Sequence, residues 1–421
     1  DRKKAFLADL GVGTIDQALL AVLQAKHQSL RLFGLADKVL IVDEAHAYDP
    51  YMQEELKRLL EFQAAQGGSA IVLSATLPLR VRRDLAAAFT KGLGQSAPVI
   101  AKLDYPLVTL VSAAGAVEEA KAHRADLGRR LTVERLVSED EAHDRIAEAA
   151  RAGAAVAWVR NTVDDAIEAF ERLRNAGIAA ELFHARYAMG DRLEIERRVV
   201  QRWGKHGDPA KRPGVLVATQ VVEQSLDLDF DLMVSDLAPV DLLLQRAGRL
   251  WRHTHRPRPV PGPTLLLLSP DPDGEVTRDW LTALLPRAGW VYRNHALLWL
   301  SARELFTRGA VSVPEDVRRL VEAVYGEGAE TGAPAALERC WIEAAGKESA
   351  DRAVAEMNLL SLKDGYGGGQ AGWNDEARIP TRLGEPMATL RLARWDGDRL
   401  VPWCADPEPA RAWALSEVSV R

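Results

Sequence analysis

The sequence predicts an α/β protein with two parallel-sheet lobes, the first incomplete, followed by a helical linker and a small terminal domain. Short apolar runs alternate with segments of helical periodicity. The same strand–helix–strand order occurs in two separate parts of the chain. Because this order is typical of βαβ units, the strands of both lobes are expected to run parallel.

The first lobe is predicted from a single βαβ unit. Residues 38–42 form a short apolar run that ends at an acidic pair, as a buried parallel strand would. A helix is predicted over 51–65, with one apolar face, and Gly67-Gly68 ends it. Residues 70–73 form the next strand.

The second lobe repeats the pattern at greater length. Strands are predicted at 154–159, 181–184, 215–218 and 232–236, and helices at 163–175, 190–203 and 240–247. Four prolines between 257 and 263 predict a stiff connector after this lobe.

The rest of the chain is predicted from weaker patterns. Residues 278–346 are mostly helical, with Trp280, Trp290 and Trp299 expected to pack in the interior. Residues 365–374 form a flexible loop, and 386–403 alternate apolar and polar residues as strands do. The expected domains are therefore 1–105 and 106–265 for the two lobes, 266–346 for the helical linker and 347–421 for the terminal domain.

Composition excludes several protein classes. The 421 residues carry a net charge of −6, which argues against a uniformly basic surface but allows a basic groove. No apolar run is long enough to span a membrane. Two cysteines are too few for a disulfide framework or a zinc cluster and fit a reducing cytoplasm. The chain starts at Asp1 rather than Met, so it is expected to be an excerpt.

An acidic motif, Asp43-Glu44-Ala45-His46, follows the first strand. Asp43 is suited to hold Mg²⁺ between the β- and γ-phosphates of ATP, and Glu44 to activate the attacking water as a general base. His46 could relay the state of the nucleotide to a neighbouring domain. The alternative is an acidic strand end before a helix, where carboxylates favour the helix dipole.

Ser74 and Thr76 follow the next strand, so they are expected at the same sheet edge as the acidic motif. Open α/β sheets bind ligands at that edge, which indicates a role in nucleotide binding or coupling. Taken alone, the two hydroxyls would predict only a capping turn.

An arginine-rich string occupies residues 245–252 and gives the strongest single signal. Arg249 and Arg252 are three residues apart, on one helix face. Guanidinium groups beside a transferring phosphoryl group act as arginine fingers, which accelerate the reaction by about 10³–10⁵ in GTPases. Gln245 could contact the attacking water. The alternative is a basic patch on a solvated helix.

Two further segments are suited to nucleic acid. Thr219 follows a strand and can donate to a phosphate, while Asp227 can reach the sugar of a nucleotide. Residues 11–17 place Thr14 at a helix start, where backbone amides can hold a DNA phosphate. A polar loop and a plain N-cap turn are the respective alternatives.

The doublet His143-Asp144 is typical of metal-dependent nucleases, but it lies on an alanine- and glutamate-rich helix without a second histidine at ligand spacing. A surface helix is expected instead. The nine histidines form no zinc pattern.

Taken in order, these strings resemble superfamily 2 helicase motifs. Their extended details resemble the CRISPR-associated helicase–nuclease of type I systems. The strings are 12–17, 43–49, 74–78, the His-Ala-Arg-Tyr string that contains Arg186, 219–227, 245–252 and, near the end, 381–386. The resemblance is strong from about 11 to 254 and looser to 421.

This resemblance implies two RecA-like lobes that bind ATP and Mg²⁺. It implies 3′–5′ movement along single-stranded DNA, the displaced non-target strand, with Thr14, Arg186 and Thr219 on the nucleic acid. It also implies recruitment by an RNA-guided surveillance complex and cutting by a separate HD nuclease domain with its own metal. Arg252, Arg249 and Gln245 would act on the ATP held by Asp43.

Two departures from the family pattern limit this expectation. No Gly-x-x-x-x-Gly-Lys-[Ser/Thr] phosphate loop occurs, and the HD domain is absent; the family carries both upstream of the first residue here. Ser225 stands where generic superfamily members have glycine. The isolated chain is therefore expected to be inactive. Another superfamily 2 RNA or DNA helicase and a non-catalytic nucleic-acid-binding scaffold remain alternatives.

Overall fold

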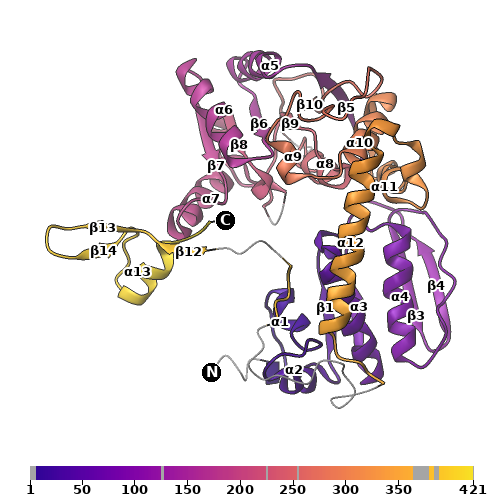
Figure 1. The fold of residues 1–421 in the computed structure, drawn as a ribbon. Helices are drawn as coiled ribbons and strands as arrows, with labels where there is room; N and C mark the ends of the chain where they lie inside the picture. The colour runs from indigo at the N-terminus through magenta and orange to yellow at the C-terminus, as the bar shows by residue number, and fades with distance from the viewer. Residues whose placement is uncertain are drawn as a thin grey trace. The chain divides into compact units, whose positions relative to one another are not determined.

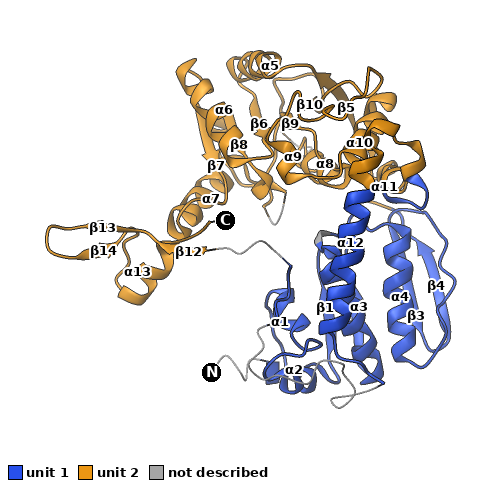
Figure 2. Cartoon of the chain, in the orientation of Figure 1, with its two compact units in different colours: residues 1–122, 325–329, 342–384 blue, residues 123–324, 330–341, 385–421 orange. Residues whose placement is uncertain are grey.

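The computed structural model describes residues 6–124, 128–223, 226–253, 256–363, 379–383 and 388–420. The predicted loop at 365–374 and Ser225 lie outside these ranges. The chain divides into two compact units (Figure 2): unit 1 comprises 1–122, 325–329 and 342–384, and unit 2 comprises 123–324, 330–341 and 385–421. Within the described ranges, no helix is long and apolar enough to cross a membrane.

Unit 1 contains a small parallel sheet with helices beside it (Figure 1). Its elements are α1 (Ile15–Leu19), α2 (Gln28–Leu35), β1 (Val39–Val42), the 3-10 turn η2 (Ala45–Ala47), α3 (Pro50–Ala65), β2 (Ser69–Val72), α4 (Leu79–Gly92), the hairpin β3 (Leu107–Ser112) and β4 (Gly115–Ala120), and most of α12 (Glu338–Asn358). Strands β1 and β2 pair in parallel from Val39 beside Ser69 to Val42 beside Val72.

Helix α3 shows why this unit folds as the sequence predicts. The Asp49 carboxylate accepts a hydrogen bond from the Met52 amide at 2.9 Å and caps the helix start. The apolar stripe of the helix is buried in the core of the unit, beside the inward-facing Leu40 and Val42 of β1. The opposite face of β1 exposes Val39 at 58%.

Unit 2 contains a seven-stranded sheet in the order β11-β5-β10-β9-β6-β8-β7. Its strands are β5 (Arg129–Leu136), β6 (Ala155–Val159), β7 (Ala180–Phe183), β8 (Gly214–Ala218), β9 (Leu232–Asp236), β10 (Thr264–Leu268) and β11 (Ala310–Val313). Every neighbouring pair is parallel except β11 and β5, which are antiparallel. The predicted α/β class is confirmed.

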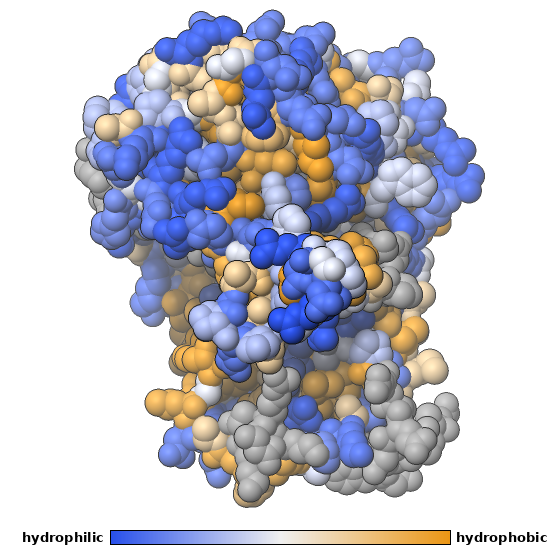
Figure 3. All heavy atoms as spheres, turned by 90° about the vertical axis from the view of Figure 1, so that its left-hand side faces the viewer, coloured by the Kyte–Doolittle hydropathy of each residue, from blue (hydrophilic) through white to orange (hydrophobic). Residues whose placement is uncertain are grey.

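The helices of unit 2 connect these strands. They are α5 (Glu139–Arg151), α6 (Val163–Asn175), α7 (Met189–Trp203), η4 (Pro209–Lys211), η5 (Gln220–Val222), α8 (Val240–Ala247), α9 (Ala288–Val291), α10 (His295–Arg308), α11 (Val317–Tyr325), η6 (Ala329–Gly332) and η7 (Ala335–Leu337). Hydrophilic residues cover much of the face of unit 2 seen in Figure 3.

The last part of unit 2 is formed by the end of the chain. It contains β12 (Ala388–Arg391), β13 (Ala393–Trp395), β14 (Leu400–Pro402), α13 (Pro409–Leu415) and β15 (Glu417–Val420). β12 pairs with β15, and β13 pairs with β14, both antiparallel. The indole of Trp403 donates a hydrogen bond to Asp191 of α7 at 2.8 Å and helps to attach this part to the sheet domain.

Three features differ from the sequence-based expectation. The segment 278–346 contains β11, whose four residues join the edge of the sheet. Trp280 and Trp299 are buried as expected, but Trp290 is 80% exposed because it lies on a four-residue surface helix. Residues 266–324 belong to unit 2 rather than to a separate linker, and 347–384 belong to unit 1.

Candidate functional site

The acidic motif of unit 1 lies where β1 ends, beside the end of β2. Backbone hydrogen bonding continues past the ends of β1 and β2: Leu73 N–H donates to Val42 O at 2.8 Å, and Ala45 N–H donates to Leu73 O at 3.1 Å. The exposed Asp43 and Glu44 are thereby held at the carboxyl edge of the sheet. This placement is the one that the sequence predicted.

His46 joins the two loops at this edge. Its Nδ1 lies 3.0 Å from the Ser74 hydroxyl and 3.4 Å from the Glu44 carboxylate. Glu44 has a φ of 54°, in the left-handed region, and its N–H donates to the Asp43 carboxylate at 3.0 Å. A non-glycine residue held in this region is typical of functional sites, where surrounding contacts fix an otherwise unfavourable backbone.

Thr76 lies deeper than the other predicted residues. It is 4% exposed, and its hydroxyl has no hydrogen-bond partner within the described ranges. A buried hydroxyl without a partner is uncommon, because burial without a hydrogen bond costs about 1–3 kcal/mol. Thr76 lies on the loop after β2, two residues after Ser74, at the sheet edge that carries the acidic motif.

The residues present fit one part of a nucleotide–metal site. Among the described residues, no group of three histidine, cysteine, aspartate or glutamate side chains could hold a metal alone. Mg²⁺ commonly takes one or two carboxylates together with substrate phosphates, and Asp43 offers one exposed carboxylate. The sequence contains no phosphate-binding lysine loop. The acidic residues are therefore suited to hold the metal and the attacking water, but not to bind the whole triphosphate.

The predicted residues of unit 2 gather at the point where the strand order of its sheet reverses. β8 and β9 pair with opposite sides of β6, so the loops after these three strands diverge there. In open α/β sheets, ligands bind at this kind of position. Residues 219–227 follow β8, and the arginine-rich string lies on and after α8.

Arg246 organises this edge. It is fully buried and donates to Glu223 at 2.7 Å, to the Ser235 hydroxyl at 2.8 Å and to the carbonyl of Asp236 at 3.2 Å. It therefore connects the loops after β8 and β9 with α8. Arg246 belongs to the arginine-rich string, but the sequence pattern predicted no role for it, and its place near the two finger candidates was the signal that could have pointed to it.

The two finger candidates contact the 219–227 segment. Arg249 donates to the carbonyl of Glu223 at 2.8 Å and to that of Val222 at 3.3 Å. Arg252 pairs with Asp227 at 2.5 Å, and both side chains are nearly half exposed. Arg252 is thus placed at the surface with its charge partly accessible. Gln245 is half-buried on α8, which ends at Ala247. Arg249 and Arg252 follow the end of this helix, so the expectation that they share one helix face was wrong.

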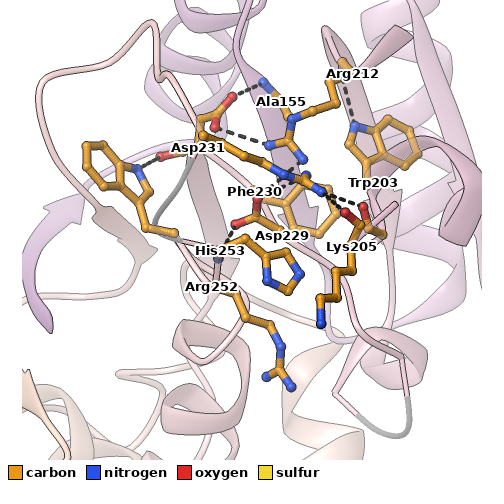
Figure 4. A network of polar contacts seen from close by, with 12 residues as sticks. Ala155, Trp203, Lys205, Arg212, Asp229, Phe230, Asp231, Arg252 and His253 are labelled. Carbon is orange, nitrogen blue, oxygen red and sulfur yellow. Dashed lines mark hydrogen bonds and ion pairs between the residues drawn. The ribbon is translucent and has the colours of Figure 1, made fainter. Parts of the chain in front are cut away.

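A buried ionic network supports the segment that carries Arg252 (Figure 4). Asp229 and Asp231, both almost completely buried, share three guanidinium groups. These belong to Arg212, Arg256 and Arg258, with contacts from 2.6 to 3.4 Å. Asp229 also accepts the backbone N–H of His253 at 3.4 Å. The Arg252 guanidinium points away from this network (Figure 4).

The network was not predicted, because its members lie outside the motifs. Its charge-assisted hydrogen bonds hold the backbone at His253, directly after Arg252. Trp251, with a φ of 48°, donates from its indole to the carbonyl of Asp231 at 3.0 Å. The residues around Arg252 are therefore held in place while its own side chain stays accessible.

The three residues predicted to contact nucleic acid differ in exposure. Thr14 is exposed and precedes α1, but its side chain makes no cap hydrogen bond. The helix has only five residues, so its dipole supports no anion site. Arg186 is exposed and pairs with Asp164 at 2.8 Å. Thr219 is 3% exposed, so its hydroxyl reaches a phosphate only after a rearrangement.

The string around Arg186 is ordered by an aromatic pair. His184 stacks on Tyr187 with ring centroids 4.1 Å apart, and its Nδ1 accepts the Arg186 N–H at 3.1 Å. Burial, with a contribution from the Arg186 charge, lowers the pKa of His184 to about 4. The imidazole is therefore neutral at neutral pH and acts as an acceptor.

The discounted doublet lies where it was expected. His143 and Asp144 are on α5, with His143 Nδ1 3.7 Å from its neighbour's carboxylate. No further acidic or histidine ligand joins them within the described chain.

The chain is similar to known proteins over almost its whole length. The family model "CRISPR-associated nuclease/helicase Cas3, C-terminal" matches residues 152–255. The CRISPR-associated endonuclease/helicase Cas3 of Escherichia coli (strain K12) is 39% identical over 343 residues, which cover 77% of this chain and 37% of that protein. The chain thus spans less than half the length of this curated relative.

Solved structures give the same result. The crystal structure of T. fusca Cas3 with ADP has a TM-score of 0.86 at 31% identity and covers 100% of this chain and 52% of that one. A chain of a "CRISPR RNA-guided surveillance complex, pre-nicking" has a TM-score of 0.81 at 32% identity, with coverages of 100% and 54%. These similarities confirm the resemblance to the CRISPR-associated helicase–nuclease of type I systems.

Proposed function

We propose, from the premise that this chain is a relative of the Cas3 family of CRISPR-associated nuclease/helicases, that it forms the larger part of an ATP-driven motor on single-stranded DNA. The observation that carries the proposal is the meeting of Asp43, Glu44, His46 and Ser74 at one carboxyl edge. An accessible acidic pair with an attached histidine is suited to nucleotide hydrolysis.

In unit 1, Asp43 would hold Mg²⁺ and Glu44 would orient and deprotonate the attacking water. Bound Mg²⁺ neutralises the charge that develops on the phosphates. His46, through Ser74, would transmit the state of the nucleotide along the loop that ends at Thr76. The four residues Asp43, Glu44, His46 and Ser74 all belong to unit 1.

In unit 2, Arg249 and Arg252 would stabilise the charge that develops on the transferring phosphoryl group. Gln245 would contact the water, and Asp227 would reach the nucleotide sugar. The Arg252–Asp227 pair is compatible with this because both side chains are partly exposed. ATP that binds both units better in one arrangement would shift their equilibrium, and this shift drives movement.

Thr14, Arg186 and Thr219 are the proposed contacts to the DNA backbone. The proposed substrate is the displaced non-target strand, traversed 3′ to 5′. The similar chain in an RNA-guided surveillance complex supports a partner of that kind for this protein, in antiviral defence. Degradation would require an HD nuclease domain, with its own metal, outside this chain.

The test is ATP turnover by the intact protein that carries this chain, with and without single-stranded DNA. Strong stimulation by DNA, and little by RNA of the same length, is expected. Turnover that RNA stimulates equally would support an RNA or other superfamily 2 motor. Absence of turnover in the intact protein would overturn the motor proposal in favour of a binding scaffold.

A further inference from the structure

A short segment late in the chain is clasped to the first helix of unit 1. We call residues 379–383 the strap. Asp16 accepts three hydrogen bonds from it: from the Thr381 hydroxyl at 2.8 Å, from Arg382 Nε at 2.8 Å and from Arg382 Nη2 at 2.9 Å. Both carboxylate oxygens face the guanidinium fork, which is the strongest geometry for this pair.

The strap is also attached through its backbone and its apolar residues. Tyr51, fully buried in α3, donates from its hydroxyl to the carbonyl of Pro380 at 2.9 Å. The same hydroxyl accepts from Asn358 at 3.2 Å. Ile379 and Leu383 pack against the core of unit 1. The strap is therefore a built part of this unit, although more than three hundred residues separate it from α1.

The clasp stands beside an exposed loop. Asp16 follows Thr14 by two residues, and residues 10–14 immediately before it are all exposed. Leu10 is 92% exposed and Val12 is 108% exposed, and added side chains at Gly11 and Gly13 would meet only open space. A loop with so few contacts of its own depends for order on the residues that flank it: Asp16 on one side and, on the other, Ala8, whose carbonyl accepts a hydrogen bond from Lys38 Nζ.

The clasp also borders the acidic edge. Tyr48 donates from its hydroxyl to the carbonyl of Asp43 at 3.3 Å. Arg382 lies close enough to the half-buried Tyr48 hydroxyl for its positive charge to act on it. Arg382 thus lies close both to the exposed loop and to the residue that supports the acidic motif.

We propose that Arg382 is a positioning residue for DNA binding: by clasping Asp16 it orders the loop 10–14 before the strand binds, and so sets the DNA concentration that stimulates ATP turnover. The proposal rests on the proposed function. Ordering a loop in advance removes an entropic cost from binding. Loss of the clasp should therefore weaken DNA binding while leaving turnover at saturating DNA nearly unchanged.

The experiment uses the intact protein that carries this chain. Binding of a single-stranded oligo(dT) is measured by fluorescence anisotropy without nucleotide, and ATP turnover is measured against the concentration of the same DNA. The variants are Arg382→Gln, Arg382→Lys, Asp16→Asn and the Asp16→Asn/Arg382→Gln double variant. Arg382→Gln should raise both the Kd and the half-stimulating concentration by about 1.5- to fivefold, the scale of a partly exposed ion pair.

Lysine keeps the charge but not the fork, so Arg382→Lys should recover part of the loss. Asp16→Asn should resemble Arg382→Gln, and the double variant should add little to either, because each removes the same contact. Arg58→Gln is the matched control: Arg58 also ties α3 to a distant segment, pairing with Glu356 at 2.9 Å, but among the described residues it has no ion pair with α1.

The outcomes separate the two proposals. An unmodified protein that shows no DNA-stimulated turnover overturns the proposed function, and the positioning role with it. A protein that DNA stimulates normally, but whose clasp variants bind DNA as tightly as the unmodified protein, overturns the positioning role alone. An equal loss in Arg58→Gln would show that any loosening of unit 1 has this effect, which also overturns it.

Discussion

Replacing Glu55 by glutamine should stabilise unit 1, by an amount that grows with pH. Glu55 lies on α3, is 0% exposed, and neither of its carboxylate oxygens has a hydrogen-bond partner among the described residues. Burial, with the charges of Asp49 and Asp16, raises its pKa from 4.5 to about 9. Tyr51 and Arg382 oppose this shift, but the Tyr51 proton is donated to Pro380.

The sign and size follow from these two pKa values. Below pH 4.5, the ordinary pKa, Glu55 is protonated in both the folded and the unfolded protein, so its ionisation does not change the free energy of unfolding. As the pH rises from there to about 9, the unfolded chain loses the proton and the folded chain keeps it, so stability falls. The cost is about 1.4 kcal/mol per pH unit, or roughly 3 kcal/mol at neutral pH.

Glutamine has nearly the shape of glutamic acid but cannot ionise, so the Glu55→Gln variant lacks this pH-dependent loss of stability. Hydrogen exchange of the α3 backbone amides, followed by mass spectrometry at about pH 6 and about pH 8, measures the opening of this unit alone. The opening constant of the unmodified protein, divided by that of Glu55→Gln at the same pH, should rise about tenfold per pH unit. Glu61→Gln is the control on the same helix, since Glu61 pairs with Lys91 at 3.0 Å and its loss should destabilise.

A ratio that stays constant between the two pH values would refute the reasoning, because it would mean that Glu55 is ionised in the folded protein. A destabilised Glu55→Gln variant would show that the carboxyl donates a hydrogen bond that glutamine cannot replace. Either result would remove the unpartnered, neutral glutamic acid from the account of unit 1.

Three further predictions concern unit 2. Arg252→Ala should lower DNA-stimulated ATP turnover of the intact protein by about 10³-fold, whereas Arg197→Ala, on the exposed side of α7, should leave it unchanged; equal turnover in both would defeat the finger assignment. Arg246→Leu should cost about 3–5 kcal/mol in thermal or urea unfolding because the Glu223 carboxylate is left buried and unpaired, and adding Glu223→Leu should restore most of it. The pKa of His184 is about 4 in the folded protein, below its ordinary 6.5, so the free energy of unfolding should fall as the pH drops from 6.5 to about 4. His184→Gln should remove about 1–2 kcal/mol of that loss near pH 5. A variant whose stability has the same pH dependence as the unmodified protein would contradict the neutral His184.

The candidate site was predicted where its residues follow strands. Apolar runs identify strand ends locally, and parallel strands present those ends at one edge, so Ser74 was expected near the acidic motif and lies 3.0 Å from His46. The exposure of these residues could not be predicted in the same way. Thr219 is buried although it follows a strand as Ser74 does, because exposure depends on what packs above the loop.

The sequence by itself determined the local elements, since hydrophobic periodicity and capping act within a few residues. The helix predicted at 163–175 and the strand predicted at 232–236 coincide with α6 and β9. Only the tertiary structure decided the contacts between distant segments. Arg382 on Asp16, the guanidinium groups around Asp229 and the place of β11 at the sheet edge depend on how the whole chain is routed. Such contacts are governed by topology and shared burial, and no periodicity in the sequence marks which residues will meet.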